Sequence, residues 1–402
     1  MSSVNFLEKL LDGVIIEWQS VSEIFDIKNG YTPSKSSNEY WADGSINWFR
    51  MDDIREKGNI LQESIQKISS SAVKSGKLFP ENSIIISTSA TIGEHALIKV
   101  PHLANQRFTS LSIKSKYKNI FDIKFIFYYC YLLAEWCKKN TTVSSFASVD
   151  MDGFRRFSFP IISPDNPKKS LEIQAEIVRI LDAMTAHTAE LTAELTAELT
   201  ARKKQYNYYR DKLLSFEDGE VEWKTLGEVA YINTGSKPEE IHDEATDFDY
   251  INAGTTRSGY SEESNCEGDT VTTPSRGQGG IGFVGYQKNC FWLGPLCYKI
   301  RSSDENQLIN KYIYYYLQSN SKIIIELKKE GGVPAVNKSD LTKLNLPIPS
   351  VARQKYIVST LDKFDALTAS ITEGLPREIE LRQKQYAYYR DLLLSFPKPQ
   401  EA

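Results

Sequence analysis

Four polar loops contain the side chains of this sequence that are best suited to bind another molecule. Arg276 carries a planar guanidinium that can donate two parallel hydrogen bonds to guanine, and Gln278 can make an equivalent pair of bonds to adenine. Lys35 and Lys237 suit phosphate groups, because each carries a positive charge on a flexible stem. The same residue types are common in loops that only contact solvent. The residues therefore leave two interpretations open, binding of nucleic acid and simple solvation of the loop.

These loops occur at matching places in two halves of the chain. GYTPSKSS (30–37) and GSKPEE (235–240) follow the first strand-like segment of each half. STSATIG (87–93) and TPSRGQGGIG (273–282) follow a later strand-like segment. The candidates for nucleic-acid contacts are Tyr31, Ser34, Lys35, Thr88, Ser89, Thr91, Lys237, Arg257, Arg276 and Gln278.

The sequence contains no recognisable catalytic constellation. GQGGIG (277–282) formally matches a dinucleotide fingerprint, but the strand-like segment IGFVGY (281–286) follows where that fingerprint requires a helix. Phosphate-loop, amino-methyltransferase and nuclease motifs are absent from the sequence, as is a Ser/His/Asp arrangement. The four histidines are scattered and the five cysteines lack a CxxC spacing, so we expect five buried thiols and no metal, with a metal site as the alternative. The residues favour a binding protein over an enzyme.

The composition bounds the class of protein. With 402 residues, 41% hydrophobic and 25% charged, the chain can form two or three globular domains. No apolar run approaches the roughly 20 residues of a membrane span, and Glu8, Lys9 and Asp12 make the N-terminus a poor signal peptide. We therefore expect a cytoplasmic protein. The net charge of −4 argues against an isolated nucleic-acid binder, but leaves local basic loops or a larger assembly open.

The chain contains two copies of one plan. QAEIVRILDAMTAHTAEL, from Gln174, matches QKYIVSTLDKFDALTASI, from Gln354, and KKQYNYYRDKLLSF (203–216) matches QKQYAYYRDLLLSF (383–396). Further upstream, EWQSVSEIFDIKNG (17–30) resembles EWKTLGEVAYINTG (222–235), and KFIFYY (124–129) resembles KYIYYY (311–316). Each half is thus a globular region followed by a helical one, and the globular regions differ mainly in their middles. Such divergence suggests two related modules that recognise different ligands.

The two ends of the chain also match an internal junction. LLDGVIIEW (10–18) resembles LSFEDGEVEW (214–223), so the chain starts within a helix-to-globule junction of the kind found at its centre. The tail LLLSFPKP (392–399) ends where such a junction begins. A duplication of this form predicts a circular arrangement with approximate two-fold symmetry.

Long helices are predicted between and after the globular regions. Apolar residues recur every three or four positions from Ile173, and neither Gly nor Pro interrupts residues 168–216. The second helical region has the same stripe but is expected to break near Gly374 and Pro376. Each stripe needs an apolar partner, and the simplest is the other copy, packed antiparallel.

The central helix contains the tetrad TAEL three times in succession, at 188–199. Four residues added to a heptad pattern keep the apolar stripe roughly in place, and they lengthen a helix by ~6 Å. The tetrad is therefore suited to act as an adjustable spacer, although an ordinary coiled-coil segment is the alternative. The spacer positions on the stripe are Thr188, Leu191, Leu195 and Leu199.

The predicted fold class is α+β, with two globular α/β domains separated by two long antiparallel helices that form a coiled coil. The predicted segments are an N-terminal segment that completes the scaffold (1–16), domain 1 (17–165), the central helix (166–216), domain 2 (217–349) and a C-terminal helical region (350–402).

Over its whole length the sequence resembles the specificity (S) subunits of type I restriction-modification enzymes. NGYTPSKSSNEYWADGSINWFRMDDI (29–54) is similar to the G-x-TP-S…YW…I-x-W opening that is frequent in that family. The TAEL tetrads and RKKQYNYYRD (202–211) resemble the type IC branch, in which tandem TAEL units separate the domains. The second module departs from the opening pattern, with TGSKPEEIHDEATDFDYINAG at 234–254.

The resemblance implies a function and a set of partners. Each target-recognition domain would read one half of a bipartite site in the major groove of double-stranded DNA. Two methyltransferase subunits would bring S-adenosylmethionine, and restriction subunits would use ATP and Mg²⁺, while this chain would bind no cofactor and catalyse nothing. A coiled-coil adaptor without DNA specificity and a hydrolase are the alternatives from other classes.

Overall fold

The computed structural model describes residues 3–142, 147–217, 219–277, 279–329, 332–368 and 374–398. Contacts divide the chain into two compact units, each described separately below. Unit 1 comprises Met1–Thr192 and Leu381–Ala402, and unit 2 comprises Ala193–Glu380. The division falls within the central helix, because each part of that helix packs on its own globular domain.

Unit 1 is built on a five-stranded sheet in the order β2-β9-β6-β7-β4 and a three-stranded sheet in the order β5-β3-β8. Two strand pairs, β1-β12 and β10-β11, complete it. The strands are β1 (Ile16–Ser20), β2 (Phe25–Asn29), β3 (Ile46–Phe49), β4 (Ile60–Leu61), β5 (Lys67–Ile68), β6 (Ser83–Ser87), β7 (His95–Ile98), β8 (His102–Ala104), β9 (Phe108–Ile113), β10 (Thr141–Thr142), β11 (Ser148–Val149) and β12 (Ser158–Ile162).

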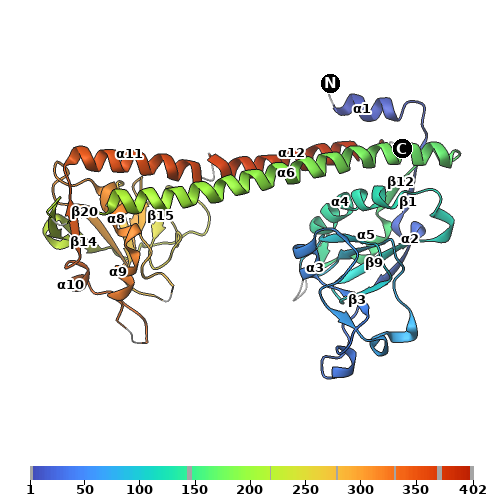
Figure 1. Ribbon diagram of the computed structural model, residues 1–402, viewed down its shortest axis with the longest axis horizontal. Helices are drawn as coiled ribbons and strands as arrows, with labels where there is room; N and C mark the ends of the chain where they lie inside the picture. The colour runs from blue at the N-terminus through green and yellow to red at the C-terminus, as the bar shows by residue number, and fades with distance from the viewer. Residues whose placement is uncertain are drawn as a thin grey trace. The chain divides into compact units, whose positions relative to one another are not determined.

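Apart from its parts of the long helices described below, unit 1 has short helices and one of 17 residues, α4, which lies between the strands and the central helix (Figure 1). Asp122 caps α4 by accepting hydrogen bonds from the backbone N–H groups of Lys124 and Phe125, at 2.7 and 3.2 Å. The helices are α1 (Ser3–Leu10), α2 (Val21–Ile24), α3 (Met51–Lys57), α4 (Ile123–Lys139) and α5 (Met151–Arg156), with 3₁₀ turns η1 (Asn38–Tyr40), η2 (Ser70–Ala72), η3 (Lys74–Gly76) and η4 (Ser115–Tyr117).

Unit 2 has a four-stranded sheet in the order β14-β20-β17-β18, a three-stranded sheet in the order β16-β15-β19 and the pair β13-β21. The strands are β13 (Glu222–Thr225), β14 (Ala230–Thr234), β15 (Phe248–Ile251), β16 (Gly259–Ser261), β17 (Thr270–Pro274), β18 (Gly285–Gln287), β19 (Trp292–Leu293), β20 (Cys297–Ser302) and β21 (Asn345–Ile348). Its short helices are α7 (Leu226–Val229), α8 (Asn310–Ser319), α9 (Ser321–Glu326) and α10 (Lys338–Leu341).

The two units share one strand topology, although the sequences of their middle parts differ. The order β14-β20-β17-β18 repeats β2-β9-β6-β7, and β16-β15-β19 repeats β5-β3-β8. The small sheets even share a parallel pair, with Tyr250 opposite Trp292 as Trp48 is opposite Leu103. The predicted duplication therefore extends to the regions whose sequences no longer match.

Two glycines fix the same chain crossing in each unit. Gly30 follows β2 and Gly235 follows β14, and a Cβ at either position would overlap the backbone oxygen of Ala104 or Leu293. Only glycine allows so close an approach. This explains why the sequence match between the two halves runs up to these glycines.

The predicted long helices are confirmed. The central helix α6 (Pro167–Leu214) has 48 residues, and the C-terminal region forms α11 (Val351–Thr368) and α12 (Gly374–Leu393). α12 begins at Gly374, which adopts a φ of +77°, and Pro376 lies in its first turn, whereas residues 369–373 are outside the described residues. The four spacer positions Thr188, Leu191, Leu195 and Leu199 are half-buried, as expected for an apolar seam.

Each part of α6 packs on a C-terminal helix within its own unit. In unit 1 the hydroxyls of Thr185 and Tyr386 lie 2.8 Å apart, which joins α6 to α12. In unit 2 the rings of Tyr206 and Tyr209 lie 6.1 and 5.8 Å from the ring of Phe364, which joins α6 to α11. The predicted helix pairing is thus present in both units.

The strand pairs at the two domain-to-helix junctions are alike. β1 pairs with β12 so that Trp18 lies opposite Pro160, and β13 pairs with β21 so that Trp223 lies opposite Pro347. In unit 1 the C-terminal tail reaches this junction, because the Trp18 indole donates to the carbonyl of Pro397 at 3.2 Å. In unit 2 the chain that follows α6 packs Phe216 against the domain core, as the tail packs Phe396 in unit 1.

In each unit, one ionic contact joins the globular domain to a long helix. Asp182 on α6 accepts hydrogen bonds from Lys124 Nζ (2.6 Å) and Tyr128 Oη (2.7 Å) on α4. Asp362 on α11 accepts the same bonds from Lys311 (2.8 Å) and Tyr315 (2.6 Å) on α8. We call these contacts the two clamps. They give a physical reason for the repeated LD and K-x₃-Y motifs.

A buried glutamine supports each clamp. Gln174 accepts from the backbone N–H of Asp122 and donates to the carbonyl of Ile120, both at 2.8 Å. Gln354 likewise accepts from the backbone N–H of Ile309 (2.9 Å) and donates to the carbonyl of Gln307 (2.8 Å). Each glutamine therefore ties the start of α4 or α8 to the adjoining long helix.

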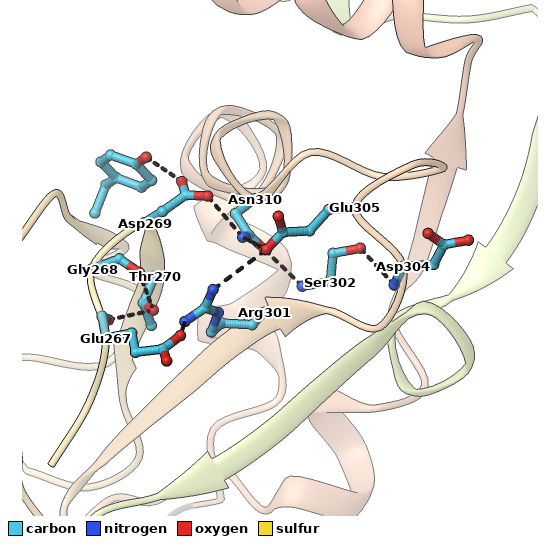
Figure 2. Close-up of polar contacts among 10 residues, drawn as sticks. Glu267, Gly268, Asp269, Thr270, Arg301, Ser302, Asp304, Glu305 and Asn310 are labelled. Atoms are coloured by element: carbon cyan, nitrogen blue, oxygen red, sulfur yellow. Dashed lines mark hydrogen bonds and ion pairs between the residues drawn. The ribbon is translucent and has the colours of Figure 1, made fainter. Parts of the chain in front are cut away.

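A polar network anchors the start of α8 to the sheet of unit 2 (Figure 2). The buried amide of Asn310 donates to Asp269 (3.0 Å) and Glu305 (3.2 Å), while its oxygen accepts from the backbone N–H of Ser302 (2.7 Å). Arg301 bridges Glu267 and Glu305 beside it. The neutral amide thus separates two carboxylates that would otherwise repel each other.

Three local predictions were wrong. The predicted strand 281–286 is mostly a turn, since Gly282 adopts a φ of +92° and β18 starts only at Gly285. The apolar pattern of residues 310–327 predicts one helix that repeats the helix at 123–137, but the chain breaks at Asn320, whose side chain donates to the carbonyl of Tyr316 at 2.9 Å. Cys290 is exposed, whereas the other four cysteines are buried as predicted.

Candidate nucleic-acid interface

Three loops meet at one end of the domain in unit 1. The loop after β2 is held by backbone bonds from Gly30 to Phe108 and from Tyr31 to Ala104, both at 2.8 Å. The β6–β7 loop meets the β8–β9 turn where the Thr88 N–H donates to the carbonyl of Arg107 at 2.9 Å. We call this set, residues 30–37, 88–94 and 105–107, the first rim.

The first rim borders a cationic hollow of about 630 Å³. Its positively charged lining residues are Lys35, Arg50, Arg55 and Arg107, and its only acidic lining residue is Asp52. The half-buried indole of Trp41 also lines it, with its ring centroid 5.1 Å from that of the buried Trp48. Cations beside flat aromatic surfaces are suited to phosphates and nucleobases.

The predicted residues of unit 1 divide into two groups. Lys35 and Ser34 are exposed, and Lys35 lines the hollow. Tyr31 serves the fold, since its hydroxyl donates to the carbonyl of Ala72 (3.1 Å) and accepts from the backbone of Lys74 (2.8 Å). Thr88 also faces inward, with its hydroxyl 3.0 Å from that of Thr109.

The remaining two predicted residues of unit 1 are half-buried. Ser89 forms an isolated bridge with Ser148. The hydroxyl oxygen of Thr91 is buried and has no protein partner among the described residues. Neither reaches far from the rim, so both are less suited than Lys35 to contact a ligand first.

A second rim occupies the equivalent end of the domain in unit 2. It consists of the loop after β14 (235–240), the β17–β18 loop from Ser275 and the β19–β20 turn (294–296). The N–H of Ser275 donates to the carbonyl of Leu296 at 2.9 Å, as Thr88 donates to Arg107 in the first rim. Lys237 and Arg276 are both exposed on this second rim. Gln278 lies outside the described residues.

Arg257 is held by its own unit. Its guanidinium lies 2.9 Å from Asp249 and 4.3 Å from the ring centroid of Tyr260. The hydrogen bond that Arg257 donates to Asp249 raises the pKa of Arg257. It lines a smaller hollow, of about 240 Å³, with Thr272 and Gln287. This pairing favours a structural role for Arg257 over base recognition.

Sequence reasoning missed four residues of the first rim and its hollow, namely Trp41, Arg50, Arg55 and Arg107. The first three lie within or beside the opening motif at 29–54, in which Arg50 follows the aromatic pair Trp48-Phe49. Arg107 carries no local signal, because it reaches the rim only through the pairing of β8 and β9 with other strands. Among the described residues no group of three His, Cys, Asp or Glu is placed to hold a metal ion.

The architecture is that of a tandem recognition protein, with one scaffold used twice and chemically different rims. A family model described as "Type I restriction modification DNA specificity domain" matches residues 15–201 and 219–381. The chain therefore belongs to the type I restriction-modification specificity family. Within the described residues, no helix is long and apolar enough to cross a membrane.

Two curated relatives from Escherichia coli are similar over nearly the whole chain. The type I restriction enzyme EcoprrI specificity subunit is 53% identical over 380 residues, which cover 93% of each chain. The EcoR124I/EcoR124II specificity subunit is 37% identical and covers 100% of this chain and 99% of its own. A solved chain from work on assembly and conformational transition of the type I R-M system has a TM-score of 0.64 at 15% identity. It covers 94% of this chain and 97% of its own, and it supports the fold alone.

Proposed function

We propose that this chain is the DNA-recognition subunit of a type I restriction-modification complex and that each domain reads one half of a bipartite site. The observation that carries the proposal is the repeated scaffold whose two rims differ in chemistry. A single scaffold gives both domains the same approach to DNA, and different rim residues give each domain its own sequence.

The chain is proposed to be non-catalytic and to bind no cofactor. S-adenosylmethionine would belong to methyltransferase partners, and ATP with Mg²⁺ to restriction partners, all in the cytoplasm. The relatives' names support the complex, and the tandem TAEL tetrads support the type IC branch.

The long helices are proposed to dock two methyltransferase subunits. α6 and α12 carry the same YYRD motif, and Tyr208 and Tyr388 within it are 61% and 64% exposed. Tyrosine is enriched in protein interfaces because it offers a large apolar face and a hydroxyl. The repetition of the exposed tyrosine on both helices supports two docking sites of one kind.

The test combines the chain with its methyltransferase partner. We expect the complex to retard one bipartite duplex in a band shift and to methylate that site, whereas the chain alone should neither methylate nor cleave DNA. Replacing residues 17–162 with those of a relative should change one half-site and leave the other unchanged. Equal affinity for random duplexes would instead support an adaptor without DNA specificity.

A further inference from the structure

The backbone allows the two rims to be compared residue by residue. Asn105 donates to the carbonyl of Phe49 (3.0 Å), as Gly294 donates to that of Ile251 (2.7 Å). The contact from Thr88 to Arg107 has its counterpart from Ser275 to Leu296, at 2.9 Å in both cases.

A further bond extends the comparison into the neighbouring loops. Val149 donates to the carbonyl of Thr88 (3.0 Å), and Val336 donates to that of Ser275 (2.9 Å). Arg107 is therefore equivalent to Leu296. Thr88 is likewise equivalent to Ser275. The residues that follow them, Ser89 and Arg276, are therefore equivalent as well.

The β8–β9 turn of unit 1 presents polar chemistry on a fixed backbone. The Asn105 side chain accepts from the N–H of Arg107 at 3.0 Å, and the Asn105 carbonyl accepts from Phe108 at 3.1 Å. Thr32 donates to the side-chain oxygen of Gln106. With the turn held in this way, the exposed Arg107 side chain has a defined origin beside the cationic hollow.

The equivalent turn of unit 2 cannot offer the same chemistry. It reads Gly294-Pro295-Leu296, in which proline lacks an N–H and leucine lacks side-chain hydrogen-bonding groups. Leu296 is 36% exposed at the position of Arg107.

The adjoining loops show the reverse distribution. Unit 1 has Ser89, Ala90 and Thr91 after the paired Thr88, and none of these can reach far from the backbone. Unit 2 has the exposed Arg276 at the position of Ser89. One guanidinium is thus present at each rim, but it comes from a different loop.

We propose that domain 1 reads its half-site from the β8–β9 turn, with Arg107 contacting guanine, whereas domain 2 reads from the β17–β18 loop through Arg276. The inference rests on the proposed DNA-recognition function and assigns its specificity residues. Lys35 and Arg55 then lie beside Arg107 in the same hollow, with charges suited to the flanking phosphates, whereas Arg50 is paired with Asp52 at 3.5 Å. Because the arginines start from different loops of one scaffold, the two domains place their guanine contacts at different positions within their half-sites.

The experiment compares the complex of wild-type chain and methyltransferase with the Arg107→Leu variant, which copies the residue found in unit 2. Methylated sites are mapped, and affinity is measured on duplexes with single base-pair changes. We expect discrimination at one guanine of the domain 1 half-site to fall roughly 10- to 100-fold, as for loss of a bidentate contact. The domain 2 half-site should be unchanged.

Two further variants test the assignment. Arg107→Lys should restore much of the general affinity, since the charge remains, but not the discrimination, since lysine lacks the planar fork. Leu296→Ala should leave the domain 2 half-site unchanged. An unaltered domain 1 half-site in Arg107→Leu, full specificity in Arg107→Lys, or a changed domain 2 half-site in Leu296→Ala would each overturn the inference.

The experiment distinguishes a failure of the proposed function from a failure of the assignment of Arg107. If the wild-type complex shows no preferred DNA site, the proposed function itself is wrong. If the wild type has a bipartite site and Arg107→Leu keeps it intact, only the assignment of Arg107 is wrong. Thermal unfolding of each variant confirms that the exposed substitution leaves the fold unchanged.

Discussion

Arg257 and Arg276 were both predicted to contact nucleic acid, and their surroundings now separate them. Arg257 is paired with Asp249 and stacked on Tyr260, so binding DNA would require breaking both contacts. Arg276 is exposed at the second rim. Arg257 would gain less binding free energy from a contact with DNA, because it would first lose contacts within the fold. The exposed Arg276 is therefore the better candidate for a base contact.

Arg276→Ala is expected to relax the half-site read by domain 2, at a cost of about 1–3 kcal/mol for a lost bidentate guanine contact. Lys35→Ala provides the contrast, since loss of a phosphate contact should weaken binding to all sequences and reduce the salt dependence by about one unit. Mapping of methylated sites and salt titrations of affinity measure both. Unchanged affinity and specificity in Arg276→Ala would place this residue outside the interface.

Two buried histidines make unit 1 sensitive to acid. Burial lowers the pKa of His95 and of His102 from 6.5 to about 4. The unfolded chain therefore binds protons first, and the stability that comes from neutral imidazoles is lost as the pH falls from 6.5 towards 4. It is fully present above pH 6.5.

His102→Phe tests this pH dependence, because His102 already packs edge-on against Phe49 and Phe79. Below pH 6.5 the variant should lose stability less steeply, by about one proton in the slope of unfolding free energy against pH. Urea unfolding between pH 4 and 7.5 measures the slope. An identical slope in the variant would show that His102 titrates in the same way in both states.

At the scale of elements, the two clamps decide how each domain is held on its helix. α4 and α8 present a lysine and a tyrosine one turn apart, and α6 and α11 supply the aspartate. A charged acceptor with two donors gives stronger hydrogen bonds than neutral pairs do. The same geometry in both units means that a domain can be exchanged while its attachment is preserved.

Asp362→Asn should destabilise unit 2 by roughly 1–2 kcal/mol, because the charge-assisted bonds from Lys311 and Tyr315 become weak or are lost. Asp182→Asn should have the corresponding effect on unit 1. Glu176→Gln is the matched control, since its pair with Arg179 lies within one turn of α6, joins no other element and contributes little. Denaturant unfolding of the three variants decides the matter, and equal effects of all three would contradict a special role for the clamps.

The start of α8 offers a second prediction at this scale. Asn310→Asp would place a third carboxylate between Asp269 and Glu305 in a buried position, where like charges are costly. We expect a loss of stability that exceeds that of Asn310→Ala and grows as the pH rises above about 5. A smaller loss in the aspartate variant than in the alanine variant, measured by thermal unfolding, would contradict this account of the network.

At the scale of the whole molecule, the tetrads should act as a ruler between the half-sites. Deleting Thr192–Leu195 removes ~6 Å of helix and rotates its ends by ~40° relative to each other. One base pair of B-DNA rises about 3.4 Å and turns about 35°. Because the seam is kept, we predict that the nonspecific spacer shortens by one base pair while both half-sites stay the same.

Deletion of only two residues is the matched control for the ruler. It would turn the seam by ~200° and should damage assembly instead of changing the spacer. Methylated-site mapping of both variants provides the measurement. An unchanged spacer after deletion of a whole tetrad, or altered half-sites, would mean that the repeat does not set the distance.

The sequence by itself determined the duplication, the long helices and the paired loops. Period and repetition are local properties, so the seam through Leu191 and Leu195 and the match between Asp182 and Asp362 could be found without coordinates. The family followed from the same motifs. The chemistry of individual loop residues, in contrast, was only partly accessible.

Only the tertiary structure decided which polar residues face outward and which loops are equivalent. Tyr31 and Thr88 fit a binding loop by type, but their hydroxyls are used inside the fold. Arg107 reaches the rim because strands distant in sequence pair around it, and no local pattern records such pairing. The equivalence of Arg107 and Leu296 likewise depends on backbone hydrogen bonds, which persist after side chains have diverged.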